Sequence, residues 1–226
     1  VIISNSVTSI GSSTFSYCSS LTSVVIPDSV TSIGYSAFRE CSSLTSVTIP
    51  DSVTSIGDSA FTYCSSLMSI EIPDSVIFID TAAFYGCSNL TNINIPNGVK
   101  AIGFETFRGC SSLASIILPE GMTSIGESAF CYCVSLAEII IPNGVTSIDV
   151  SAFYFCNSLT SITIPASITK IARFAFVGCE KLHDVYCYAE KVPSTNSDAF
   201  AYSHIENSTL HVPAASIEQY KTTTPW

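Results

Sequence analysis

The apolar positions of the chain fall into columns that recur every 23 residues. One column is isoleucine, from Ile10 to Ile171, and another is proline, from Pro27 to Pro165. A third column is phenylalanine, at Phe15, Phe38, Phe61, Phe84, Phe107, Phe130, Phe153 and Phe176. A fourth is cysteine, at Cys18, Cys41, Cys64, Cys87, Cys110, Cys133, Cys156 and Cys179. Eight copies without an insertion or deletion predict one small unit stacked on copies of itself, with a core that runs along the molecule.

Each unit is predicted to contain a strand, a turn, an extended segment and a tight bend. Residues 44–50 alternate apolar and polar side chains and end on a proline, which is typical of a short strand. Pro50 and Asp51 suit the second and third positions of a type I turn. Residues 53–57 look extended, and residues 59–64 offer one turn of α-helix or 3₁₀-helix. The unit therefore turns its Leu, Val, Ile, Phe and Cys inward and its Ser and Thr outward.

The repeated pattern Leu-x-x-Val/Ile-x-Ile-Pro-x-x-Val-x-x-Ile-Gly-x-x-Ala-Phe-x-x-Cys resembles the 23-residue leucine-rich repeats of the BspA-like family of bacterial surface proteins. The resemblance implies a repeat solenoid: a right-handed leucine-rich-repeat coil with a parallel β-sheet on the concave face and short helical, 3₁₀ or extended segments on the convex face. It also implies adhesion or ligand capture rather than catalysis, and a location at the bacterial cell surface or outside the cell.

The two ends depart from the regular pattern. Residues 1–3 align with the strand residues 24–26, so we expect that the chain begins inside a strand and that sequence upstream of it has been removed. We divide the chain into eight 23-residue leucine-rich repeats, residues 1–182, and a degenerate last repeat with a C-terminal cap, residues 183–226. Residues 209–213 are expected to form a final strand and residues 214–221 a short helix that covers the last layer of core.

The composition narrows the classes of partner. The chain is 47% apolar and only 12% charged, with a net charge of −10. This acidic balance repels phosphate backbones and anionic lipid headgroups, so we expect no nucleic-acid partner. No apolar run approaches the roughly 20 residues that a membrane-spanning helix needs, so we expect no membrane insertion.

The cysteine column is interpreted as a ladder of free, buried thiols. Neighbouring turns are close enough for a disulfide, but side chains that all point inward in one direction cannot turn their Cβ atoms toward each other. Only Cys131 and Cys133 lie near each other in sequence, which is too little for a metal site, so no metal is expected. Cys131 falls in a polar column and is expected to be exposed.

Two further patterns have alternative interpretations. The residue after each proline is acidic or Asn in most units, from Asp28 to Asn143, and turn chemistry explains this better than a row of calcium ligands. The triplets that begin at Asp28, Asp51 and Asp74 resemble an acceptor signature of bacterial O-glycosylation, although the repeat itself generates most of them. Asn207 begins an Asn-glycosylation triplet, which matters only in a eukaryotic secretory pathway.

Catalytic motifs are missing from the sequence. All three histidines, His183, His204 and His211, lie in the last unit and the cap, and no serine elbow, zinc-protease motif or phosphate-binding loop occurs. We therefore predict that the chain is not an enzyme and needs no cofactor.

The exposed side of the predicted strands is the candidate binding surface, because the otherwise uniform units vary there. Ile117 and Ile140 form an apolar pair, which is a modest indication of a contact site, although β-branched residues also simply suit strands. We predict a non-catalytic adhesion module that recognises a host or matrix protein or a glycan; the alternative is a structural spacer without a ligand. The candidate binding residues are Glu71, Asn94, Ile117, Glu138, Ile140, Thr163 and Tyr186.

Overall fold

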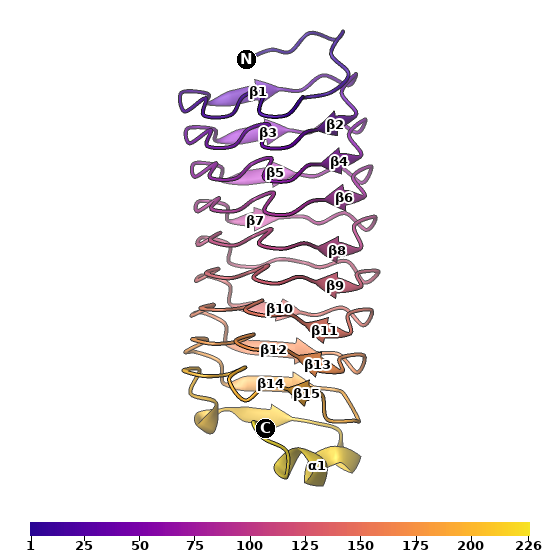
Figure 1. Cartoon of the computed structure of the whole chain (residues 1–226), viewed down its shortest axis with the longest axis vertical. Helices are drawn as coiled ribbons and strands as arrows, with labels where there is room; N and C mark the ends of the chain where they lie inside the picture. Colours follow the sequence, from indigo (N-terminus) through magenta and orange to yellow (C-terminus); the bar gives the residue numbers. More distant parts are fainter.

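The computed structural model describes residues 1–226 as a column of stacked turns, and the main strand of each turn pairs with the same strand of its neighbours (Figure 1). These main strands form two four-stranded parallel sheets. The first contains β1 (Ser23–Val25), β3 (Ser46–Thr48), β5 (Ser69–Glu71) and β7 (Asn92–Ile93). The second contains β10 (Glu138–Ile140), β12 (Ser161–Ile164), β14 (Asp184–Cys187) and β16 (Thr209–His211).

A second ladder of two-residue strands runs along the same column. It forms a three-stranded parallel sheet of β2 (Ser32–Ile33), β4 (Ser55–Ile56) and β6 (Phe78–Ile79). It then continues as a five-stranded sheet of β8 (Ala101–Ile102), β9 (Ser124–Ile125), β11 (Ser147–Ile148), β13 (Lys170–Ile171) and β15 (Ser194–Thr195). Pairs such as Ile33↔Ile56 are in the 23-residue register that the sequence predicts. The predicted parallel leucine-rich-repeat solenoid is confirmed.

The prediction of a helical turn at residues 59–64 is wrong. Ser59 and Tyr63 have positive φ angles of 57° and 58°, and the equivalent two residues are also left-handed in each turn from Ser13 to Gly178. A right-handed helix or 3₁₀ turn cannot pass through such residues. Alternate amides of this segment donate instead to carbonyls of the next turn; for example, the Phe61 N–H donates to the Ala83 carbonyl at 2.8 Å.

The turn after each main strand is also placed differently from the prediction. The Val53 N–H donates to the Pro50 carbonyl at 3.0 Å, so proline occupies the first turn position and Asp51 the second. Ser52 then takes the third position, where its hydroxyl donates to the Val30 carbonyl of the preceding turn at 2.6 Å. The hydroxyl explains why serine follows the acidic residue: it joins neighbouring turns.

One continuous cluster of 63 buried apolar residues fills the column. Its centre is a stack of phenylalanine rings from Phe15 to Phe200, with centroids 5.1–5.6 Å apart and planes within 13° of parallel. The cysteines from Cys41 to Cys179 are buried beside these rings, as predicted. Each of these thiols donates to the carbonyl of the preceding turn's phenylalanine at 3.1–3.2 Å. The thiol groups therefore point at backbone oxygens and not at one another.

Two cysteines differ from the prediction. Cys18 is exposed. Cys131 was expected to be exposed but is only 2% accessible. The guanidinium of Arg108 lies over the rings of Tyr85 and of Tyr132, the residue that follows Cys131. Burial raises the pKa of the Cys131 thiol to about 11, against the opposing effect of Arg108.

The C-terminal segment packs on the last turn. The 3₁₀ segment η1 (Ile205–Asn207) precedes β16, and η2 (Ala214–Ser216) leads into the helix α1 (Ile217–Lys221), where the sequence predicted a final strand and a short helix. Trp226 packs edge-on against Phe200 and Tyr220, with centroids 5.6 and 5.4 Å apart. These rings end the phenylalanine stack. None of the helices is long and apolar enough to cross a lipid bilayer.

Candidate functional site

The strand face, which we define as the outward side of the main strands from β1 to β16, carries all the candidate binding residues. Glu71, Asn94, Ile117, Glu138 and Ile140 are exposed there, whereas Thr163 and Tyr186 are half-buried. Parallel pairing aligns Ile140 with Thr163 and Thr163 with Tyr186, and an isolated bridge joins Asn94 to Ile117. All the candidate residues except Glu138 therefore fall in one row along the column, and Glu138 lies beside it in the row of Ser161.

The centre of this row is apolar and lies where the sheet of main strands is interrupted. Ile117 is 79% exposed and Ile140 68%, which leaves two large aliphatic side chains in solvent on neighbouring turns. Residues 115–118 form only an isolated bridge, from Ile117 to Asn94 just after β7, and no strand pair with β10, so the two main-strand sheets are separate at this point. A hollow of about 360 Å³ lies here, lined by Ile117, Glu120, Glu138 and Ile140 among others.

A polar cluster at the C-terminal end of the strand face was not predicted as a site. The Asp184 carboxylate bonds through one oxygen to His211 Nε2 and through the other to His183 Nδ1, both at 2.8 Å. These hydrogen bonds, that of His211 first, hold the pKa of Asp184 below its usual value. The His211 ring also stacks on Tyr186 with centroids 4.2 Å apart. The cluster fixes the ring of Tyr186, one of the candidate residues.

The regular 23-residue spacing of the columns does not reveal this cluster in the sequence. Asp184 pairs with Thr209, a step of 25 residues instead of 23, so His211 falls outside the aligned columns. The signal that finds it is the alternation of Thr209, Leu210 and His211, which matches Asp184, Val185 and Tyr186 once the longer step is allowed. Both segments place the apolar residue between two polar ones.

The acidic residues that follow the prolines lie one in each turn. Asp28, Asp51 and Asp74 are exposed, and each precedes a serine whose hydroxyl bonds to the turn before it. No group of three or more His, Cys, Asp or Glu side chains is arranged to hold a metal ion.

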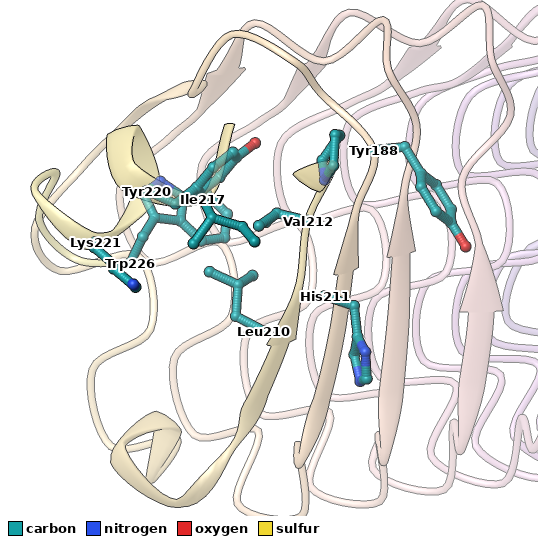
Figure 2. Close-up of a pocket in the computed structure, with 9 residues that line it drawn as sticks. Tyr188, Leu210, His211, Val212, Ile217, Tyr220, Lys221 and Trp226 are labelled. Carbon is teal, nitrogen blue, oxygen red and sulfur yellow. The ribbon is translucent and has the colours of Figure 1, made fainter. Parts of the chain in front are cut away.

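A cleft of about 640 Å³ lies at the C-terminal end, between β16 and the cap. Figure 2 shows Leu210, Ile217, Tyr220 and Trp226 gathered on the side of β16 that faces the short helix, whereas Tyr188 lies on the opposite side of that strand. The Tyr220 hydroxyl is engaged internally, because it donates to the Ala189 carbonyl at 2.8 Å. The cleft is thus the apolar seam along which the cap packs on the solenoid.

Comparisons with solved structures give several bacterial repeat proteins of the same fold. A leucine-rich-repeat protein from T. pallidum is 34% identical, with a TM-score of 0.68 over 71% of this chain and 78% of that one. A leucine-rich-repeat protein from Bacteroides ovatus is 27% identical, with a TM-score of 0.62 over 94% of this chain and 65% of that one. A leucine-rich cell surface protein from Faecalibacterium prausnitzii is 29% identical, with a TM-score of 0.54 over 100% and 82%.

No curated protein matches the sequence. Residues 1–114 and 100–221 match the BspA type leucine rich repeat region, in six copies. These two overlapping matches include nearly all of the stacked turns and reach into the cap. The chain therefore belongs to the BspA-type leucine-rich-repeat family.

Proposed function

We propose that the chain is a non-catalytic binding module of a bacterial surface or secreted protein, and that it binds a protein through the strand face around Ile117 and Ile140. Repeat proteins of this family are generally non-catalytic interaction or structural modules and are typically found at bacterial surfaces. The observation that carries the proposal is the exposed isoleucine pair over the break between the two main-strand sheets.

The chemistry of this patch favours a protein over a glycan. Two aliphatic side chains, 79% and 68% exposed, gain free energy when another apolar surface removes them from water. Glu138 and Glu120 border them, which gives the apolar centre and charged rim that protein interfaces show. Exposed hydroxyls of a sugar would instead leave the isoleucines without apolar partners.

The spacer remains the second candidate function, and the uniform exterior favours it. The hydroxyls of Thr31, Thr54, Thr123 and Thr169, which share one column, donate to carbonyls of the preceding turn. The hydroxyl protons of these side chains are therefore donated within the solenoid. A stalk needs this regular, self-satisfied surface and no ligand.

The test is a binding screen of purified host-cell and extracellular-matrix proteins by surface plasmon resonance. The wild-type chain is compared with the Ile117→Glu/Ile140→Glu variant, which places two charges in the apolar patch. We expect the wild type to bind at least one protein and the variant to bind at least about tenfold more weakly, since burial of unpaired charge costs more than about 1.4 kcal/mol.

The matched control is Ile77→Glu/Phe78→Glu, which adds the same two charges to side chains 62% and 54% exposed on the shorter-strand ladder. Circular dichroism verifies that both variants fold. Equal binding by the wild type and the patch variant would refute the role of the strand face. A screen without any binder favours the spacer.

A further inference from the structure

An exposed row of aromatic side chains lies on a different part of the molecule from the strand face. Its members occupy, in some of the turns, the position two residues after the stacked phenylalanine, where the backbone is left-handed. Tyr17, Tyr63, Tyr132 and Tyr202 hold this position and are 64%, 42%, 41% and 82% exposed. Tyrosine is a costly choice for a left-handed residue, since glycine adopts that conformation freely. The stacking of the core does not require these rings.

A groove lies between Tyr17 and Tyr63 of this row. Its volume is about 520 Å³, and it spans three successive turns. Two tyrosine rings bound it, one carboxylate lies between them, and a serine from each turn contributes a hydroxyl. The lining residues are Tyr17, Ser19, Glu40, Ser42, Tyr63 and Ser65. The groove thus combines flat apolar rings with a polar floor.

The ring of Tyr63 is held in place by its neighbours. It packs edge-on against Tyr85, with centroids 5.1 Å apart. The next turn has glycine in the same column, and a Cβ atom on Gly86 would lie 2.5 Å from Cδ1 of the Tyr63 ring. Gly86 therefore leaves the space that the ring occupies. A ring already fixed before binding loses little conformational entropy when a ligand stacks on it.

The charges in the groove favour a neutral ligand. Glu40, the only carboxylate in the lining, pairs with Arg39 at 3.4 Å, and no lysine lines the groove. A sulfated or phosphorylated ligand would meet no free cation. A protein segment would meet only two apolar side chains, which do not form a continuous patch. The hydroxyls of a sugar suit Glu40 and the serines, and the C–H faces of its ring suit the tyrosine rings.

The spacing of the turns narrows the class of sugar. Adjacent turns are 5.2 Å apart between the stacked rings of Phe15, Phe38 and Phe61. A pyranose in an extended β-1,4-linked chain advances by nearly the same distance. Alternate sugars of such a chain would therefore meet Tyr17 and Tyr63, which stand two turns apart, while the sugar between them would meet Glu40. An α-1,4-linked chain curves and loses this register.

We propose that the groove bounded by Tyr17 and Tyr63 binds a neutral, extended β-1,4-linked glycan along the axis of the solenoid. This site is separate from the strand face, so the glycan proposal can be tested independently of the proposed protein partner.

The test is isothermal titration calorimetry with cellohexaose, with N-acetylchitohexaose and, as the curved counterpart, with maltohexaose. We expect saturable binding of at least one β-1,4-linked hexasaccharide and none of maltohexaose. The Tyr17→Gly/Tyr63→Gly variant removes both rings, and it should keep its fold because glycine already occupies this column at Gly86, Gly109 and Gly178. Its affinity should fall at least about tenfold, because the variant removes both rings on which the sugars would stack.

The control is Tyr35→Ala, which removes a tyrosine that is 54% exposed near the same turns but outside the groove. It should bind the β-linked sugar as the wild type does. The proposal is overturned if neither β-linked hexasaccharide binds, if maltohexaose binds equally well, or if the glycine variant retains wild-type affinity. Thermal unfolding of the variant distinguishes lost binding from lost fold.

Discussion

At the scale of single residues, the solenoid is built from conformations that L-amino acids rarely adopt. Every full turn bends through two left-handed residues, and most of them are not glycine. Ser36 is one, with φ of 51°, and its buried hydroxyl has no hydrogen-bond partner. Ser59 is the equivalent residue of the next turn, but its hydroxyl donates to the Asp58 carboxylate at 2.6 Å. The two positions therefore share the backbone strain and differ in hydrogen bonding.

Ser36→Gly should raise the free energy of unfolding by about 1 kcal/mol, because it relieves the left-handed strain and removes an unsatisfied buried hydroxyl, against the backbone entropy that glycine adds. Equilibrium unfolding in urea measures the change. Ser59→Gly is the matched control and should gain less, because it also loses the hydrogen bond to Asp58. A Ser36→Gly variant that is no more stable than the wild type would contradict this explanation.

At the scale of the element, the phenylalanine stack is the part of the core that every turn shares. Phe107 is fully buried, with ring neighbours at 5.6 Å on both sides, whereas Phe15 in the first turn is only partly buried and has one stacked neighbour. Removal of a ring from the middle of the stack leaves a cavity that rigid turns cannot close.

Phe107→Ala should therefore lower the free energy of unfolding by about 3–5 kcal/mol. Phe15→Ala should lower the free energy of unfolding clearly less, because the Phe15 ring is already partly in solvent and has a stacked neighbour on only one side. Urea unfolding of both variants makes the comparison. Equal losses at the two positions would show that the stack is not the continuous core described above.

The sequence predicts these elements well where one column decides the structure. The main strands, their register and the buried cysteines follow from apolar columns that the repeat shows eight times. The left-handed bends were missed, because Tyr63 and Glu40 occupy positions where only Gly86, Gly109 and Gly178 hint at a positive φ. The burial of Cys131 was missed because the equivalent residues of most other turns are polar. The Asp184 cluster depends on one longer step between turns.

At the scale of the whole molecule, the cysteine ladder makes stability depend on pH. Burial raises the pKa of Cys41 to about 11 and that of Cys179 to about 12, and it raises the pKa of the thiols between them further. Because the folded chain keeps these thiols neutral, their contribution is present in full below the ordinary thiol value of 9.0. It is lost as the pH rises toward the folded values.

We expect the free energy of unfolding to fall steeply above pH 9, with each buried thiol adding about 1.4 kcal/mol per pH unit to the slope. Urea unfolding between pH 8 and about pH 11 measures the slope. Cys110→Ala should reduce this slope by the contribution of one thiol. A slope unaffected by Cys110→Ala would mean that the ladder thiols are not protonated and buried.

The separation of two surfaces is also a property of the whole column. The strand face presents Ile117 and Ile140 over a break in the sheets, and the aromatic groove presents Tyr17 and Tyr63 on the bends. A stacked architecture can carry two such sites because each turn contributes one residue to each surface.

The most direct test of the account is hydrogen exchange of the chain alone and in complex with a protein partner identified by the binding screen. The backbone amides around Ile117 and Ile140 lie where the two main-strand sheets are not joined, so a partner that covers this break should slow their exchange. We predict protection of residues 115–118 and 138–141 in the complex. Unchanged exchange in both segments, with protection elsewhere on the column, would contradict the strand-face account.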